Sequence, residues 1–421
     1  MDSMANPNDA RLEMPRPRSR SRALDSLSIH SYLPLAAFYF FFNNAGLPYG
    51  LFYTTLFSPF LFLWLYLKGR RWLTTKFLLV LSPFILAHIV LGIESPPQYL
   101  RTLLHWWTVY VAVYAICLAL TKCRSVDRLF EQLILLNFCA MILALACFRT
   151  PLRPFFWLDD SGSLVSGSIA VRLQLLSTEP SAYAELMLPL LVFAVLRLLR
   201  DSKRRNAVYL MMIVLPFLLC QSFGGISIGL AGIGVSLMTG YRQLLRRQRS
   251  RILFLCLAIA TGTLLLTPNP ISERVWQVVS GGDSSSNVRT VYSFTAAYSA
   301  AASKSLWWGV GLGQVKYSDF SDLHLGGMIN GLIPNAMAGT FAEFGFIGIL
   351  VVLAVEFYLF FKTTVYRNSF RLAMFVVASI NQFTGSYGSD VQQYLIWFLA
   401  FYSFFPKFNL RSDLSSKVSH P

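Results

Sequence analysis

The stretch Phe77-Leu-Leu-Val-Leu-Ser-Pro-Phe-Ile-Leu-Ala-His-Ile-Val-Leu-Gly-Ile93 decides the fold. It contains no Asp, Glu, Lys or Arg, and its apolar residues do not alternate with polar ones. An apolar run of roughly 17 to 25 residues is long enough to cross a bilayer as a helix. Lipid offers no hydrogen-bond partner to the backbone, so a spanning segment must be a helix or a strand of a closed barrel. A barrel strand would alternate, and we therefore predict a transmembrane helix.

Similar apolar runs recur along the whole chain. Of its 421 residues, 55% are hydrophobic and 13% are charged, and the mean hydropathy is +0.53. A soluble domain carries about 25% charged residues. The sequence predicts an all-α, polytopic integral membrane protein with about 12 transmembrane helices. The predicted spans lie near residues 31–47, 51–67, 74–93, 101–121, 130–149, 182–199, 206–221, 224–239, 252–267, 336–361, 371–386 and 391–406.

The basic residues gather in alternate segments between these runs. Of the 36 Lys and Arg residues, 28 fall in one set of segments and eight in the other. Cytoplasmic segments carry the excess of Lys and Arg, so the net charge of +16 indicates topology rather than nucleic-acid binding. We predict a disordered basic cytoplasmic tail over residues 1–30, a transmembrane domain over 31–406 and a second cytoplasmic tail over 407–421. Both termini are then cytoplasmic.

Two long segments lie on the outer side in this topology, at about residues 150–181 and 268–335. Both are rich in aromatic residues and leucine, which argues against disorder. Apolar residues recur at helical spacing from Ser286 to Ser303, which predicts an amphipathic helix at the membrane surface. The six cysteines show no paired spacing in a long loop, so we expect neither a disulfide framework nor a metal site.

Two groups of glycines stand out. In the eighth predicted span, small residues recur every three or four positions, at Gly225, Gly229, Gly232, Ser236 and Gly240. This spacing predicts close helix packing, with a substrate channel as the alternative.

The segment Gly309-Val-Gly-Leu-Gly313 superficially resembles a nucleotide-binding loop. It follows no predicted strand and opens no βαβ unit, so we predict a sharp turn at the membrane surface instead.

The few cations of the outer segments are informative because they oppose the topological preference. Arg172 and Arg289 each lie in a long outer segment with apolar neighbours. Arginine binds phosphate with two parallel hydrogen bonds and keeps its charge when desolvated. The two arginines are therefore candidates for binding a lipid-linked phosphate or pyrophosphate. Pairing with a lipid headgroup or a nearby acid is the alternative.

Three acid–base candidates lie near the outer face. Glu179 precedes a predicted span and could act as a general base, or serve only at the helix N-terminus, since Pro180 suits a first helical position. His324 lies in the large outer segment and could be a base or incidental. Glu343 lies about two turns inside a span, where an acid is costly and usually functional. Glu356 is the one other deep acid that the predicted spans indicate.

Three motifs in order resemble the O-antigen polymerase and ligase superfamily. The family's outer-loop arginine, short helix and glycine turn are similar to two segments of this chain. These are Arg289-Thr-Val-Tyr-Ser-Phe-Thr-Ala-Ala-Tyr and Trp307-Trp-Gly-Val-Gly-Leu-Gly-Gln314. Pro334-Asn335, followed after nine residues by Gly345-Phe-Ile-Gly348, resembles its His-Asn element. Arg172 with Ser177-Thr-Glu-Pro-Ser181 resembles a segment of the polymerase branch. The resemblance covers about residues 70–405.

This resemblance implies a polymerase of the bacterial inner membrane. It would join oligosaccharide repeats carried on undecaprenyl pyrophosphate, at the periplasmic face, for exopolysaccharide or O-antigen, as a metal-independent glycosyltransferase without cofactor. Its partners would be the lipid-linked oligosaccharide, membrane lipids, a chain-length regulator and export machinery, and no nucleic acid. Arg172 and Arg289 would hold pyrophosphate and Glu179 or His324 would be the catalytic base. The supporting residues would be Asn335, Glu343 and Lys304.

The sequence also allows other functions. Ligases of the superfamily carry a histidine where this chain has Pro334, which disfavours a ligase or a glycan-to-protein transferase because proline has no ionisable group. A transporter or flippase would show internal repeats and paired broken helices, and we find no convincing repeat in the sequence.

Overall fold

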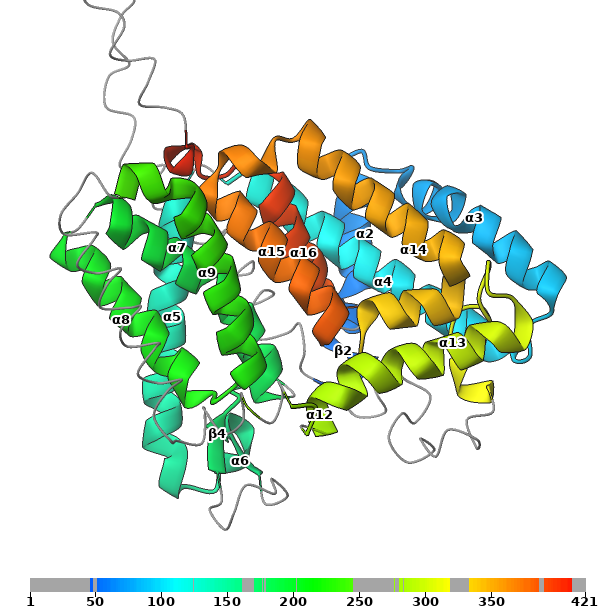
Figure 1. The fold of residues 1–421 in the computed structure, drawn as a ribbon, viewed down its shortest axis with the longest axis horizontal. Helices are drawn as coiled ribbons and strands as arrows, with labels where there is room; N and C mark the ends of the chain where they lie inside the picture. The colour runs from blue at the N-terminus through cyan, green and yellow to red at the C-terminus, as the bar shows by residue number, and fades with distance from the viewer. Residues whose placement is uncertain are drawn as a thin grey trace, which may run out of the picture.

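The computed structural model describes most of the chain and is mainly helical (Figure 1). Two antiparallel pairs of short strands complete it, β1 (Gly46–Leu47) with β2 (Leu51–Phe52) and β3 (Trp157–Asp160) with β4 (Ala170–Leu173). The described residues are 46–47, 51–123, 125–160, 170–175, 177, 179–201, 203–244, 276, 280–282, 284–318, 333–385 and 390–410.

Ten long helices coincide with ten of the predicted spans. They are α2 (Tyr53–Leu67), α3 (Leu73–Leu91), α4 (Pro96–Thr121), α5 (Val126–Ala146), α7 (Pro180–Arg200), α8 (Arg204–Leu219), α9 (Phe223–Leu244), α14 (Ala336–Lys362), α15 (Ser369–Thr384) and α16 (Val391–Phe401). The predicted span 252–267, and 31–47 apart from β1, lie outside the described residues.

Several of these helices have the dimensions of a membrane span. Among the described residues, five are long and apolar enough to cross a membrane: Leu73–Leu91, Pro96–Thr121, Val126–Arg149, Pro180–Arg200 and Ala336–Lys362. The stretch Val126–Arg149 consists of α5 and the 3₁₀ turn η2 (Cys147–Arg149) that follows it. The described chain is thus mainly helical and contains helices with the length and composition of membrane spans.

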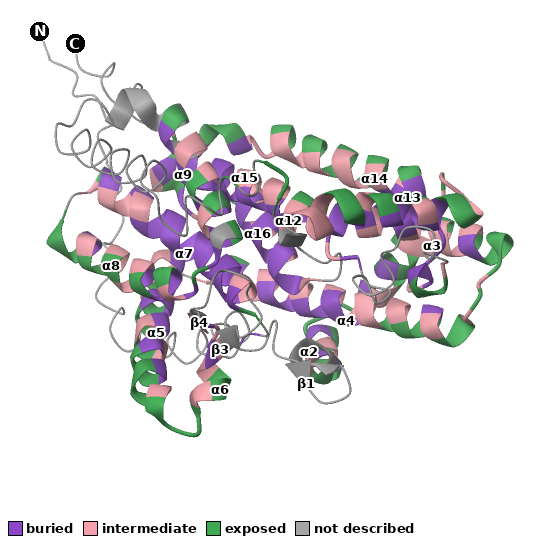
Figure 2. Cartoon of the chain, turned by 60° about the horizontal axis from the view of Figure 1, so that its bottom comes forward, coloured by how far each residue is buried: buried purple, intermediate pink, exposed green. Residues whose placement is uncertain are grey.

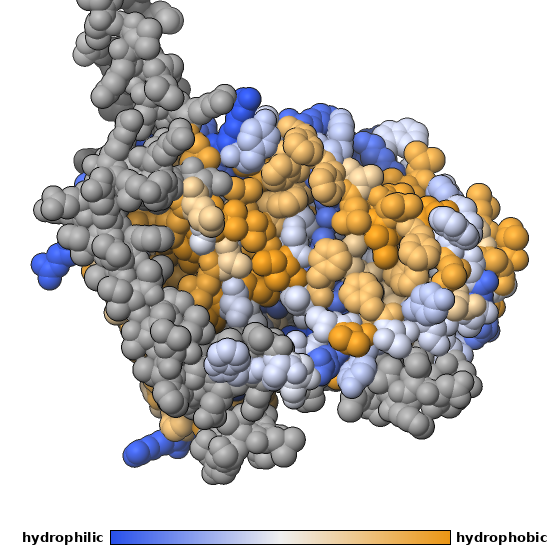
Figure 3. Space-filling model, viewed as in Figure 1, coloured by the Kyte–Doolittle hydropathy of each residue, from blue (hydrophilic) through white to orange (hydrophobic). Residues whose placement is uncertain are grey.

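The helices form two groups with α15 and α16 between them (Figure 1). One group holds α5, α7, α8 and α9, and the other holds α2, α3, α4 and α14. Buried residues concentrate in α7, α15, α16 and the first half of α14, whereas α3 and the second half of α14 are more exposed (Figure 2). The exposed side chains on these outer helices are apolar, such as Leu79, Val90 and Phe357, and the face seen in Figure 3 is apolar over α9, α14 and α15. Such faces suit contact with lipid.

Helix α7 is the centre of the largest hydrophobic core. Of its apolar window 78% is buried inside the protein, against 39% or less for the other four candidate spans. Its side chains pack against α5, α8, α9 and α15. A helix apolar on all sides is expected to be surrounded by other helices.

The glycine stripe of α9 packs closely, as the sequence predicted. A Cβ on Gly225 would lie 2.8 Å from Ala184 Cβ of α7, and one on Gly232 would lie 2.7 Å from Val377 Cγ2 of α15. Gly229 likewise faces Leu188 of α7. The absence of side chains therefore lets α9 approach both neighbours.

Helix α14 is interrupted at Gly345, where φ is 67° and ψ is −164°. The glycine-rich segment after α13 (Ser293–Lys304) pairs with this break. Backbone N–H groups of Val310 and Phe346 donate to the carbonyls of Ala342 and Leu306 (2.9 Å each). A Cβ on Gly309 would lie 2.4 Å from the Glu343 carbonyl carbon. The predicted turn is present, since Gly309, Gly311 and Gly313 all have positive φ, but the segment also satisfies backbone groups that the break frees.

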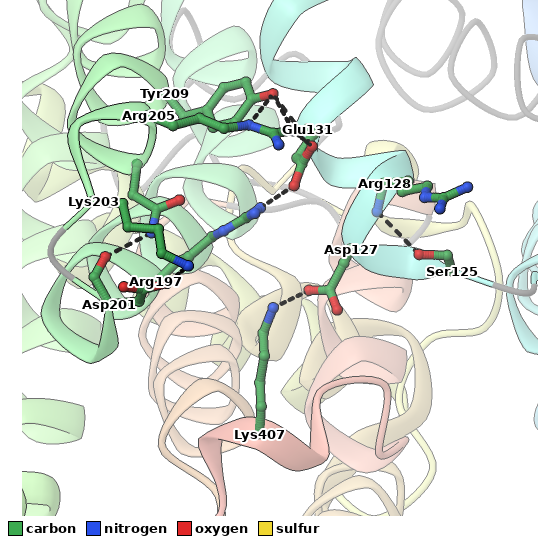
Figure 4. Close-up of polar contacts among 11 residues, drawn as sticks. Ser125, Asp127, Arg128, Glu131, Arg197, Asp201, Lys203, Arg205, Tyr209 and Lys407 are labelled. Atoms are coloured by element: carbon green, nitrogen blue, oxygen red, sulfur yellow. Dashed lines mark hydrogen bonds and ion pairs between the residues drawn. The ribbon is translucent and has the colours of Figure 1, made fainter.

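One end of the molecule carries a network of charged residues (Figure 4). Glu131 of α5 binds Arg197 at the end of α7 and Arg205 at the start of α8, the latter at 2.5 Å. Asp127 of α5 pairs with Lys407 of the 3₁₀ turn η7 (Pro406–Phe408). Burial lowers the pKa of Lys407, and its hydrogen bond with Asp127 opposes that change. We call this end the basic end.

The packing of α9 gives a test within one helix. Gly232→Ala would place a methyl group against Val377 and 3.1 Å from the Ala373 carbonyl oxygen, so we expect a loss of about 1–3 kcal/mol in the free energy of unfolding. Gly234→Ala meets nothing within 4 Å and should leave stability unchanged or raise it, because alanine favours helix. Thermal unfolding in detergent measures both. Equal melting temperatures for the two variants would contradict the close packing of α9.

Candidate functional site

Glu179 begins α7 at the end opposite the basic end. It is the N-cap residue and Pro180 is the first helical residue, as the sequence indicated. Its side chain does not cap the helix. Instead, its Oε2 accepts a hydrogen bond from Ser181 Oγ (2.8 Å) and lies 3.8 Å from Nη2 of Arg289. The Glu179 side chain is 58% exposed and that of Arg289 is 33% exposed, so a ligand in solution or at the bilayer surface can reach both.

Arg289 lies in a π-helical turn, η3 (Val288–Tyr292), between α12 (Ser284–Asn287) and α13. The predicted helix over Ser286–Ser303 is therefore present. Alanines at 296, 297, 300 and 301 form the buried face of α13, which packs on the first part of α14. This packing fixes the element that carries Arg289. A π-helical turn inside a helix often occurs at a functional site.

Asn335 ties three elements together behind Arg289. Its Nδ2 donates to the carbonyls of Arg289 (2.8 Å) and Phe383 (2.5 Å), and its Oδ1 accepts from the backbone N–H of Ala338 (2.9 Å). It is fully buried and caps α14. The predicted supporting role of Asn335 thus corresponds to a structural bridge between η3, α14 and α15.

Glu185 is a buried acid that the sequence reasoning missed. It lies in the second turn of α7, and its Oε2 accepts hydrogen bonds from Asn381 Nδ2 (3.1 Å) and Gln392 Nε2 (3.2 Å). The sequence indicates only Glu343 and Glu356 as deep acids of the predicted spans. The signal was available, because an acid inside an apolar run is costly and usually functional, but its closeness to the helix start hid it.

Gly385 lies between Arg289 and Glu185. A Cβ on Gly385 would lie 3.3 Å from Arg289 Nη1 and 3.9 Å from Glu185 Oε1. Asp390, the N-cap of α16, is a third acid at this end, and its Oδ1 accepts from the Gln392 backbone N–H (3.0 Å). Burial raises the pKa of Asp390 to about 6, and that hydrogen bond opposes the rise.

The structure anchors Arg172 separately. It lies on β4 opposite Leu158 of β3, and its Nε donates to the Cys220 carbonyl after α8 (3.2 Å). Strand β4 lies along the same edge of the molecule as α12 (Figure 1). The Cys220 carbonyl accepts a hydrogen bond from Arg172, and the acid Glu179 lies beside Arg289. Arg289 thus shows the pairing with a nearby acid that the sequence left open as an alternative.

Lys304 and Glu343 belong to a second polar cluster, in the group of helices that contains α3 and α4. Lys304 Nζ pairs with Glu94 Oε1 (3.1 Å) and donates to the Gly92 carbonyl (2.8 Å). Glu343 Oε1 accepts from the Gly313 backbone N–H (2.9 Å). Glu343 thus holds the glycine-rich segment, and Lys304 ties the end of α13 to the α3–α4 connection. These contacts are not with Arg289. The predicted base His324 lies outside the described residues.

His88 completes this second cluster. Its Nε2 lies 3.0 Å from the Trp308 carbonyl oxygen and its Nδ1 lies 2.9 Å from Tyr99 Oη. Both ring nitrogens have a partner and the side chain is buried, so His88 fixes the segment around Trp308 and is not accessible to a substrate.

The chemistry of the Glu179 end is that of a partly exposed cation beside a partly exposed carboxylate. Such an arginine can exchange its carboxylate partner for a phosphate, because both present paired oxygens to the guanidinium. The carboxylate then becomes available to accept a proton.

The chain matches no known protein-family model and no curated protein sequence.

The bridge at Asn335 predicts a loss of stability when it is removed. Asn335→Ala would remove the cap of α14 and leave two carbonyls without their partner, which should cost about 2–4 kcal/mol in the free energy of unfolding. Asn335→Asp can still accept the Ala338 hydrogen bond but cannot donate to either carbonyl. Thermal unfolding in detergent should therefore place both variants below the wild type. An Asn335→Asp variant as stable as the wild type would show that the cap alone matters.

Proposed function

We propose that the chain crosses the membrane about twelve times with both termini in the cytoplasm and its Glu179 end at the periplasm. The 21 residues of α7 span about 30 Å, the thickness of the hydrocarbon core. Its last turn carries Arg197 and Arg200, and cytoplasmic ends are the ones that collect cations. The opposite end of α7, with Glu179, is then periplasmic.

We further propose that the protein is a polymerase of oligosaccharide repeats carried on undecaprenyl pyrophosphate, at the periplasmic face of a bacterial inner membrane. The observation that carries this proposal is the pairing of Arg289 with Glu179 at one end of α7, the most buried of the five candidate spans among the described residues. The resemblance of the Arg289, Glu179 and Asn335 segments to the O-antigen polymerase and ligase superfamily supports it, and Pro334 favours a polymerase over a ligase.

The reaction would transfer a glycan from one lipid carrier to the terminal sugar of another. The pyrophosphate of the donor would replace Glu179 as the partner of Arg289. Glu179 would take the proton from the acceptor hydroxyl while the hydroxyl oxygen attacks the anomeric carbon of the donor glycan. The bond from that carbon to pyrophosphate oxygen breaks, and undecaprenyl pyrophosphate leaves with the electron pair. Pyrophosphate is a good leaving group, so positioning and charge stabilisation are the main tasks.

The test uses the purified protein and a lipid-linked oligosaccharide from its host. We expect a ladder of products at multiples of the repeat, without nucleotide sugar or added metal, seen by gel and mass spectrometry. Arg289→Ala should reduce the rate by about 100-fold or more, the usual cost of a transition-state charge contact. Arg149→Ala removes an exposed arginine of η2 and should leave the ladder intact.

A second pair of variants probes the space beside Arg289. Gly385→Ala puts a methyl group 3.3 Å from the Arg289 guanidinium and 3.9 Å from a Glu185 oxygen. It should lower the rate at normal protein levels, whereas Gly339→Ala, which meets nothing within 4 Å, should not. A full ladder from Arg289→Ala would remove the proposed pyrophosphate role. Transfer of one glycan to another lipid or to protein would indicate a ligase or transferase.

A further inference from the structure

Within the described part of the chain, Arg289 is the one cation that faces a group of acids. The charged groups described around Glu185 are Arg289 from η3, Asp390 from the start of α16 and Glu179 from the start of α7, and the amides of Asn381 and Gln392 contact it directly. If all three acids were ionised, this group of four would carry a net negative charge. A pyrophosphate, which is itself multiply negative, would then enter an environment that repels it.

The two glutamates differ in their freedom to move away. Glu179 is more than half exposed, and its contact with Arg289 is long at 3.8 Å, so it can swing out when an anion arrives. Glu185 is buried, and amide groups from α15 and α16 hold one of its oxygens. Asn381 is held in turn by Gln393 Oε1 (3.0 Å). Glu185 therefore stays beside Arg289 whatever binds there.

A fixed acid can coexist with a bound anion when it carries a proton. An ionised carboxylate buried at the end of a spanning helix is costly, and a neutral carboxylic acid leaves Arg289 with Glu179 as the partner that an anion must displace. We propose that Glu185 is a positioning residue of the Arg289 site, and that a pyrophosphate binds there only while Glu185 is protonated. This inference rests on the proposed function and adds a proton to its substrate-binding step.

The sign of the pH dependence follows from linkage. If the complex holds one proton that the free protein loses on titration of Glu185, the affinity falls by tenfold for each pH unit above that titration. The ligand acts in the opposite direction, because a terminal phosphate loses its second proton near pH ~6 and becomes more negative. Glu179 is displaced by the ligand, so its charge does not require a proton in the complex. A fall in affinity at high pH therefore points to a buried acid of the site.

The experiment measures equilibrium binding of geranyl diphosphate, a short lipid pyrophosphate, to the purified full-length protein in detergent. Affinities are determined from pH 6 to 9 by calorimetry for the wild type and Glu185→Gln, an isosteric neutral variant. We expect the wild-type affinity to fall by about tenfold per pH unit in the upper part of this range. Glu185→Gln should bind the diphosphate over the whole pH range, and its affinity should not fall at high pH.

Two further variants serve as controls. Glu343→Gln changes a buried acid of the second polar cluster and should keep the wild-type pH profile. Asp390→Asn removes the other buried acid near Glu185 and retains an oxygen that can accept the Gln392 N–H. It should also keep the fall at high pH.

The outcomes separate this inference from the proposed function. Two outcomes would overturn the role of Glu185 alone, provided that diphosphate binding depends on Arg289. One is an affinity that falls equally with pH in the wild type and in Glu185→Gln. The other is loss of binding in Glu185→Gln. An affinity that does not fall with pH in the wild type would also overturn it. Absence of diphosphate binding at every pH, or binding unchanged by Arg289→Ala, would overturn the pyrophosphate site together with this inference.

Discussion

The structure depends on the burial of one helix, α7, within the protein rather than in lipid. Four helices surround it, and its small and apolar side chains fit against α9 because glycines there leave room. Most of α7 is buried, and its two ends carry the polar residues. One end carries the arginine that joins Glu131, and the other carries Glu179 and Glu185. The charged networks at the two ends are held apart by about 30 Å of apolar helix.

Several buried polar groups of the described residues have specific hydrogen-bond partners. The break in α14 exposes backbone groups that the glycine-rich segment binds, and Asn335 binds two carbonyls that lie where η3 and α15 meet. Each unsatisfied group would cost several kcal/mol in lipid. The same requirement places Asn381 and Gln392 against Glu185. Buried hydrogen bonds thus join the elements that carry Arg289 and Glu185.

The sequence alone was sufficient for most of the helices and for the local features of the site. Hydrophobic runs located ten of the helices to within a few residues, and the helix around Arg289 and the N-terminal position of Glu179 were predicted correctly. Contacts between distant segments could not be predicted. The pairing of Arg289 with Glu179 joins residues more than 100 positions apart, and Glu185 gains its meaning only from Asn381 and Gln392. The break at Gly345 was also missed, because glycine is common in transmembrane helices. The count of twelve spans stays a prediction.

The central claim is that Arg289 and the basic end of α7 lie on opposite sides of the membrane. Single cysteines introduced into a chain without its native cysteines test it directly, one at Val291, which is exposed near Arg289, and one at Lys203, which is exposed at the basic end. A membrane-impermeant maleimide applied to intact spheroplasts should label Val291→Cys and leave Lys203→Cys unlabelled until the membrane is permeabilised. Labelling of Lys203→Cys from outside, or protection of Val291→Cys until permeabilisation, would contradict the proposed orientation and with it a periplasmic site at Arg289.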